Sequence, residues 1–241
     1  MKNIIHQAAA WSVHIFTATG MVVGFIALEM AFEGKTYEAF LLLLLAAVID
    51  GIDGTFARMF RVKEVLPDID GHLIDGVVDC LNYVIVPAVI FYKSQMVPGF
   101  LGFPMVAGIL YASMYHLSNA RQVTDDYHFR GFPAWWNLIV YYLFILDLGQ
   151  WANLCITVLF IVLHFVPVHF IYLSRMRRNR AIAFAATFLL LIINGLILFN
   201  YPHADPSLRI ASVVPLIFLL LLGSIKRELL PFRRYSENSV R

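Results

Sequence analysis

Long apolar stretches alternate with short polar ones along the whole chain. We identify eight apolar segments, each near the roughly 20 residues that a helix needs to cross a bilayer. The fifth is the shortest and begins after Pro133, so we expect it to be tilted or partly buried within a bundle. No soluble domain fits between the segments, and the pattern predicts an all-α fold, a polytopic membrane bundle of about eight transmembrane helices. The segments are residues 11–32, 37–60, 72–94, 100–121, 133–148, 151–174, 180–200 and 208–226.

The composition supports a membrane protein. Of the 241 residues, 60% are apolar and only 14% are charged, which is unusual for a soluble domain. The formal charge of +2 gives no indication of a nucleic-acid partner. Cys80 and Cys155 lie in apolar segments and form neither a disulfide framework nor a zinc site. We interpret the N-terminal segment as a retained span, because no clear small-residue cleavage site precedes its end.

Lysine and arginine residues indicate the orientation. If the N-terminus is cytoplasmic, 15 of the 18 fall on the cytoplasmic side, and Lys35, Lys93 and Arg209 fall on the other. Positive residues concentrate on the cytoplasmic side of membrane proteins. The sequence therefore predicts that both termini are cytoplasmic, in agreement with an even number of spans.

Four aspartates interrupt the second and third apolar segments. Asp50 and Asp53 share one face of a helix, and Asp75 and Asp79 share a face of the next. Asp50 lies about 15 Å and Asp79 about 12 Å from the cytoplasmic ends of their helices, at 1.5 Å per residue. Because carboxylates within a membrane are costly and usually functional, we expect one shared site that opens to the cytosol.

Such a group of like charges needs cations to stay ionised. Carboxylate oxygens are the ligands that hard divalent ions prefer. We therefore expect two divalent cations, Mg²⁺ or Mn²⁺, in this site.

The stretch from Asp50 to Asp79 resembles the signature of the CDP-alcohol phosphotransferases, D-x2-D-G-x2-A-R-x(8 or more)-G-x3-D-x3-D. The resemblance implies that four aspartates hold the metals and that Asp79 is also the catalytic base. The lipid nucleotide CDP-diacylglycerol would bind at Thr17, Gly54, Ala57, Arg58 and Gly71. His14 stands where the family usually has an asparagine, one turn before Thr17. Every fixed position is present: Asp50, Asp53, Gly54, Ala57, Arg58, Gly71, Asp75 and Asp79.

A second segment, from Phe129 to Asn137, reads Phe-Arg-Gly-Phe-Pro-Ala-Trp-Trp-Asn. It is similar to a segment of the bacterial phosphatidylcholine synthases, a branch of the same family, although an aromatic belt at the lipid interface would also explain it. The branch resemblance implies transfer of a phosphatidyl group to choline with release of CMP. Because aromatic faces hold quaternary ammonium groups, the candidates for choline binding are Asn82, Tyr83, Tyr115, Trp135 and Trp136.

The resemblance also implies the wider organisation. We expect a single transmembrane domain over residues 1–241, with the signature at 50–79 and accessory helices beyond about residue 140. We further expect a homodimer in the bacterial cytoplasmic (inner) membrane, with the active site facing the cytoplasm.

Two other functions stay open. The first is a sister enzyme that makes phosphatidylserine from serine. Phosphorylated acceptors such as glycerol 3-phosphate or inositol phosphate also stay open, because Arg121 and Arg130 could bind their phosphate group. The second is an ion-coupled transporter whose carboxylates carry cations. Release of CMP from CDP-diacylglycerol separates the enzymes from the transporter.

Overall fold

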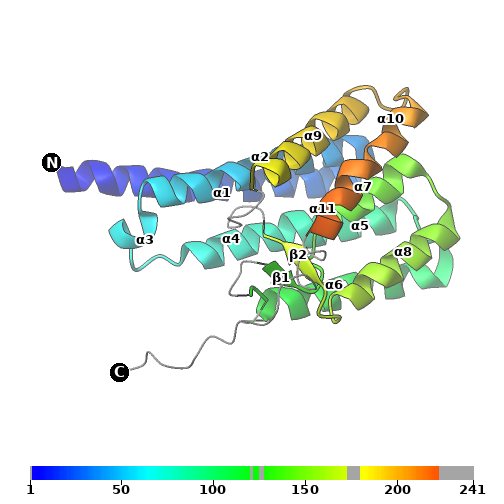
Figure 1. Cartoon of the computed structure of the whole chain (residues 1–241), viewed down its shortest axis with the longest axis horizontal. Coiled ribbons are helices and arrows are strands. Elements are labelled where there is room, and N and C mark those ends of the chain that lie inside the picture. Colours follow the sequence, from blue (N-terminus) through cyan, green and yellow to red (C-terminus); the bar gives the residue numbers. More distant parts are fainter. Residues whose placement is uncertain (1, 120–121, 125–127, 173–179, 223–241) are drawn as a thin grey trace.

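A computed structural model describes residues 2–119, 122–124, 128–172 and 180–222, and helices dominate these ranges (Figure 1). The all-α prediction is confirmed. Arg121 and the basic residues at 175–178 and beyond 222, which the orientation argument uses, lie outside the described ranges. The helices are α1 (Lys2–Phe32), α2 (Thr36–Met59), α3 (Val62–Val65), α4 (Gly71–Asp79), the π-helix η1 (Cys80–Ile85), α5 (Val86–Lys93), the 3₁₀ turn η2 (Gly99–Leu101), α6 (Gly102–Ser118), α7 (Trp136–Leu146), α8 (Gln150–Leu163), α9 (Arg180–Phe199), α10 (Pro206–Ala211) and α11 (Val213–Leu222).

Each of the eight predicted segments contains an apolar helix. Five helical stretches in the described part of the chain are long and apolar enough to cross a membrane. Three shorter apolar ones, residues 136–146, 150–163 and 206–222, account for the remaining predictions. The chain is therefore a multi-pass helical membrane bundle. The five long stretches are Ile4–Phe32, Thr36–Met59, Gly71–Lys93, Gly99–Ser118 and Ala181–Phe199.

The sixth predicted segment is shorter than expected. Its helix ends at Leu163 rather than near residue 174, because Pro167 offers no N–H to continue a helix. The chain then forms strand β2 (His169–Ile171), which pairs antiparallel with β1 (His128–Arg130) and places Phe129 opposite Phe170. This small sheet, which the apolar pattern did not predict, ties the Phe129–Asn137 segment to the end of α8.

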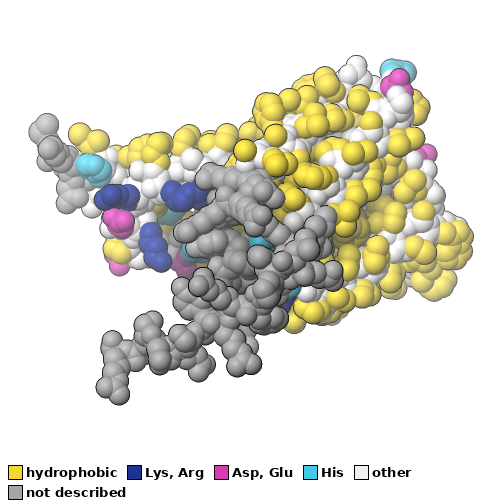
Figure 2. All heavy atoms as spheres, viewed as in Figure 1, with side chains coloured by type: hydrophobic (Ala, Val, Ile, Leu, Met, Phe, Trp, Pro, Cys, Tyr) yellow, Lys and Arg dark blue, Asp and Glu magenta, His cyan; other side chains and the backbone are white. Residues whose placement is uncertain are grey.

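The helices pack in a continuous bundle. α1 runs along α2 and also contacts α4 and α5, while α5 packs on α7 and α6 on α8 (Figure 1). α4, η1 and α5 follow one another without a break, so residues 71–93 form one long helix with a π-helical centre. Hydrophobic side chains cover most of the visible face over α7, α8, α9 and α11, as expected for a surface in contact with lipid (Figure 2).

The first helix begins at Lys2, nine residues before the predicted start. Its early turns pack through Ala10 and Val13 against Val62 of α3, which lies in the connection between α2 and α4. Charged side chains gather around this end of the molecule in Figure 2. Ala10, at the end of the extension, and Val13 thus pack α1 against the α2–α4 connection.

Candidate metal and substrate site

Helix α2 places two of the aspartates. Its buried positions recur every three or four residues, through Ala46 and Ile49 to Asp53, the periodicity of a helix face that packs on its neighbours. Asp53 thus occupies the next position of a buried stripe and is only 6% exposed. Asp50, almost one turn earlier, is partly buried.

Helix α4 places the other two. Asp70 caps its N-terminus, and one Asp70 carboxylate oxygen accepts hydrogen bonds from the backbone N–H groups of His72 (2.9 Å) and Leu73 (3.2 Å). This cap starts the helix at Gly71, so Asp75 and Asp79 follow one turn apart on one face. The family pattern does not include Asp70, but an aspartate directly before the first helical residue is a recognisable capping signal.

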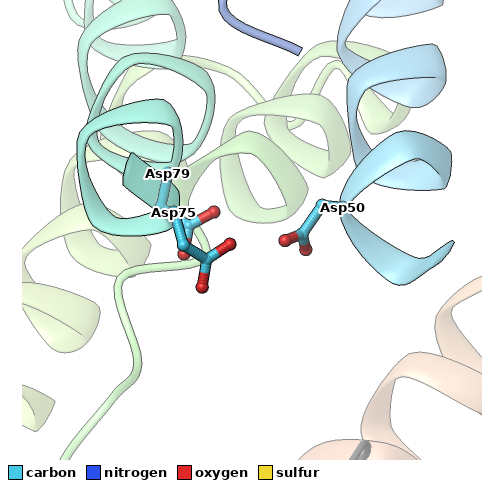
Figure 3. A group of neighbouring side chains, drawn as sticks. All are labelled: Asp50, Asp75 and Asp79. Carbon is cyan, nitrogen blue, oxygen red and sulfur yellow. The ribbon is translucent and has the colours of Figure 1, made fainter. Parts of the chain in front are cut away.

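The two helices bring three carboxylates together. Figure 3 shows Asp50 on one helix facing Asp75 and Asp79 on the other. One oxygen from each of these residues lies within 4.8 Å of the others. Three partly buried carboxylates at this spacing repel one another unless a cation lies among them, and their oxygens suit a hard divalent ion. The structure thus gathers three of the four predicted ligands into a candidate metal site.

Asp53 is absent from this group of three. Its carboxylate lies against the side chain of Thr17 on α1. Thr17 is 8% exposed, and its hydroxyl donates to the backbone carbonyl of Val13 at 3.2 Å. Asp53 and Thr17, both predicted site residues, therefore meet at the contact between α1 and α2.

The other predicted nucleotide-binding residues lie in the last two turns of α2 and at the first residue of α4. Arg58 is exposed, and its guanidinium donates to the Thr55 hydroxyl at 3.2 Å. A methyl group added at Gly71 would lie 3.3 Å from the His14 ring, so the start of α4 comes close to α1. His14 is 7% exposed, and its Nε2 has no hydrogen-bond partner among the described residues.

Gly54 and Ala57 are the other two nucleotide-binding candidates. They have no large side chain and lie between Asp53 and Arg58 on α2. Among the described residues, the contact within 4 Å of a methyl group added at Gly54 is the Arg58 guanidinium, at 3.5 Å. Ala57 packs against the small cluster of Ala10, Val13 and Val62. A ligand can therefore approach the α2 backbone closely at Gly54.

Two of the predicted acceptor residues lie on η1. The Tyr83 hydroxyl donates a hydrogen bond of 2.6 Å to Asp50 Oδ2, so Tyr83 joins the carboxylate group directly. Asn82 is 3% exposed, and its amide nitrogen donates to the backbone carbonyl of Gly20 on α1 at 3.1 Å. Asn82 therefore contributes to the packing of η1 on α1.

The remaining acceptor candidates differ in exposure. Tyr115 is 48% exposed, and its ring centroid lies 4.9 Å from that of Phe165. Trp135 is partly buried at the start of α7, where its ring meets Phe129 and Phe132 edge-on. Trp136 is completely buried within the main hydrophobic core.

Two residues that the sequence did not single out explain the burial of Trp136. Its indole N–H donates to the Ser113 hydroxyl at 2.9 Å. Its ring stacks on His164, with 5.6 Å between ring centroids and an interplanar angle of 11°. Both partners lie more than 20 residues away, and no local pattern marks them.

Comparison with known proteins adds independent information. The model of a family described as CDP-alcohol phosphatidyltransferase matches residues 12–166, more than half of the chain, including all four aspartates. The chain is 36% identical over 227 residues to a phosphatidylcholine synthase of Borreliella burgdorferi, covering 93% of this chain and 96% of that protein. It is 36% identical over 204 residues to the phosphatidylcholine synthase of Pseudomonas aeruginosa, covering 85% and 86%. The corresponding protein of Agrobacterium fabrum is 33% identical over 219 residues, covering 91% of each chain.

Proposed function

The chain belongs to the CDP-alcohol phosphatidyltransferase family, and we propose on this basis that it is a phosphatidylcholine synthase. It transfers the phosphatidyl group of CDP-diacylglycerol to choline and releases CMP. The observation that carries this proposal is the convergence of Asp50, Asp75 and Asp79 from two helices within the membrane bundle. Relatives along almost the whole chain bear the same name, which favours choline over other acceptors.

The donor set fits divalent cations. Asp50, Asp75 and Asp79 supply three carboxylates, and we propose Asp53, almost one turn along α2 from Asp50, as the fourth ligand. Two ions, Mg²⁺ or Mn²⁺, would offset the negative charge of the diphosphate and of the departing CMP when bound. The exposed Arg58 guanidinium pairs with phosphate oxygens, and Thr17, Gly54, Ala57 and Gly71 shape the surface that receives the nucleotide.

Asp79 acts as the base. The choline oxygen attacks the phosphorus that carries diacylglycerol, and the bond from that phosphorus to the CMP oxygen breaks. CMP leaves with the bonding electron pair, while Asp79 accepts the proton of the choline hydroxyl. A positioned base contributes roughly 10²–10⁴-fold to such a step.

Aromatic side chains bind the trimethylammonium group of choline, because ring faces attract quaternary cations. Tyr115 is 48% exposed and Trp135 is partly exposed, while Tyr83 lies at the carboxylate group. Trp136 and Asn82 hold the surrounding helices through their bonds to Ser113 and Gly20.

We place this site on the cytoplasmic side of the bacterial inner membrane, following the distribution of lysine and arginine. We treat the chain as one domain in which the helices beyond about residue 140 are accessory. We also propose a homodimer. Native mass spectrometry in a mild detergent tests the dimer, and monomer alone at micromolar concentration would contradict it.

An acceptor panel tests the function. Purified protein is incubated with CDP-diacylglycerol and Mn²⁺ together with choline, ethanolamine, serine, inositol or glycerol 3-phosphate, one acceptor at a time. We expect CMP release and a new lipid with choline, and much slower reaction with ethanolamine, which lacks the three methyl groups. A reaction with serine but not choline would assign the protein to the phosphatidylserine branch. Cation uptake into vesicles without CMP release would instead support a transporter.

A further inference from the structure

The helix from Gly71 to Lys93 changes its hydrogen-bonding pattern immediately after Asp79. Residues Cys80–Ile85 form a π-helix, with hydrogen bonds from residue i to i+5. Such turns are rare and often occur at functional sites. η1 lies directly after Asp75 and Asp79, two carboxylates of the candidate metal site. Its wide turn therefore affects which side chains face that site.

The wide turn changes which way Tyr83 points. On an α-helix, residues four apart drift by about 40° from a straight stripe, so Tyr83 would drift twice as far from Asp75 as Asp79 does. A turn that holds more residues removes part of this drift. Tyr83 consequently lies on the same side as Asp75 and Asp79, where its hydroxyl reaches Asp50 on the opposite helix.

The neighbouring residue holds the π-helix in place. The Asn82 amide nitrogen donates to the Gly20 carbonyl at 3.1 Å. An added methyl group at Gly24 would overlap the Asn82 side chain. The glycines of α1 thus let η1 approach closely, and Asn82 ties it there while Tyr83 faces the carboxylates.

The bond between Tyr83 and Asp50 is short, at 2.6 Å, near the lower end of the range for O–H···O hydrogen bonds. It occupies Oδ2 of Asp50 and joins two helices whose carboxylates repel each other. Without this donor, repulsion from Asp75 and Asp79 would favour rotation of the Asp50 side chain away from them. Hydrogen-bond partners of metal-ligating carboxylates commonly set the orientation of the ligand.

We infer that Tyr83 is a positioning residue, which fixes the Asp50 carboxylate for cation binding through its hydroxyl. This role differs from contact with choline, and it rests on the proposed function in so far as the carboxylate group binds a divalent cation. It gives the π-turn after Asp79 a role, because the turn brings the Tyr83 hydroxyl to Asp50.

Mn²⁺ binding to the full-length protein tests this inference. The purified protein is freed of metal with EDTA, exchanged into buffer and titrated with Mn²⁺, and the free ion is followed by electron paramagnetic resonance. Loss of an outer hydrogen-bond partner typically weakens metal binding about 10–100-fold, so we expect Tyr83→Phe to raise the Kd for Mn²⁺ by this factor. Tyr92→Phe is the matched control, because Tyr92 lies in the same long helix and is exposed; its Kd should equal that of the wild type.

A double-mutant cycle with Asp50→Asn separates positioning from a general loss of structure. If Tyr83 acts through Asp50, adding Tyr83→Phe to Asp50→Asn weakens Mn²⁺ binding no further. An equal additional loss in both backgrounds would overturn the inference. So would a Tyr83→Phe variant that binds Mn²⁺ like the wild type but has a raised KM for choline.

The wild-type protein distinguishes failure of this inference from failure of the proposed function. Mn²⁺ binding and choline transfer by the wild type, with an unchanged Kd in Tyr83→Phe, would reject the role of Tyr83 alone. No Mn²⁺ binding by the wild type would reject the metal site and the role of Tyr83 together.

Discussion

At the scale of single residues, Asp79 has two proposed tasks, metal ligation and proton acceptance. Replacement by Asn keeps the shape and an oxygen ligand but removes the base. We expect Asp79→Asn to lower turnover by roughly 10²–10⁴-fold with a much smaller change in Mn²⁺ affinity. Turnover and Mn²⁺ titration on the same preparation measure both effects. Equal loss of binding and turnover would assign Asp79 to the metals alone.

Asp53 tests whether the site extends beyond the three clustered carboxylates. It is almost fully buried and lies against Thr17 rather than within the group of three. If Asp53 is the fourth ligand, Asp53→Asn should lower the rate of CMP release by more than about tenfold while the protein stays folded. Asp68→Asn is the control, since Asp68 is exposed in the α2–α4 connection. A near wild-type rate in Asp53→Asn would remove Asp53 from the ligand set.

The sequence predicted the site residues unequally, because different kinds of contact fix them. Asp50, Asp75 and Asp79 could be predicted, since spacings of three and four set the faces of two adjacent helices. Trp135 and Trp136 could not be told apart, because the buried position of Trp136 depends on Ser113 and His164, which are distant in sequence. The bond from Tyr83 to Asp50 spans 33 residues and depends on a π-turn that no residue pattern marks.

At the scale of elements, the account depends on the close contact between α1 and η1. Gly24→Ala would push a methyl group into the Asn82 side chain and to 3.0 Å from Leu81 Cδ2. Overpacking of this kind typically costs about 1–3 kcal/mol, so we expect a lower thermal midpoint in detergent. Gly51→Ala is the matched control, because an added methyl group there meets no other side chain within 4 Å in the described part of the chain. Equal midpoints for the two variants would contradict the close packing.

The boundaries of the elements were less predictable than their existence. The lengths of the apolar stretches located all eight helical segments, but α1 begins earlier and α8 ends earlier than predicted. Ala10 and Val13 of α1 pack against Val62 of α3, and pairing of β1 with β2 directs the chain after Pro167. Both depend on tertiary contacts, which hydropathy does not report.

At the scale of the whole molecule, a long membrane bundle holds its carboxylates between two neighbouring helices rather than along a path through the bilayer. Asp50, Asp75 and Asp79 lie within one small volume. This arrangement suits a reaction between a lipid anchored in the membrane and a water-soluble acceptor. The match to the family model and to relatives over most of the chain agrees with this interpretation.

The central claim is that this carboxylate site transfers a phosphatidyl group to choline with the help of divalent cations. The most direct measurement follows isotope-labelled choline into lipid, and CMP release, with purified protein, CDP-diacylglycerol and Mn²⁺. The account predicts equal amounts of labelled phosphatidylcholine and CMP, neither product in excess EDTA, and recovery when Mn²⁺ is restored. Undiminished formation of both products in excess EDTA would contradict it.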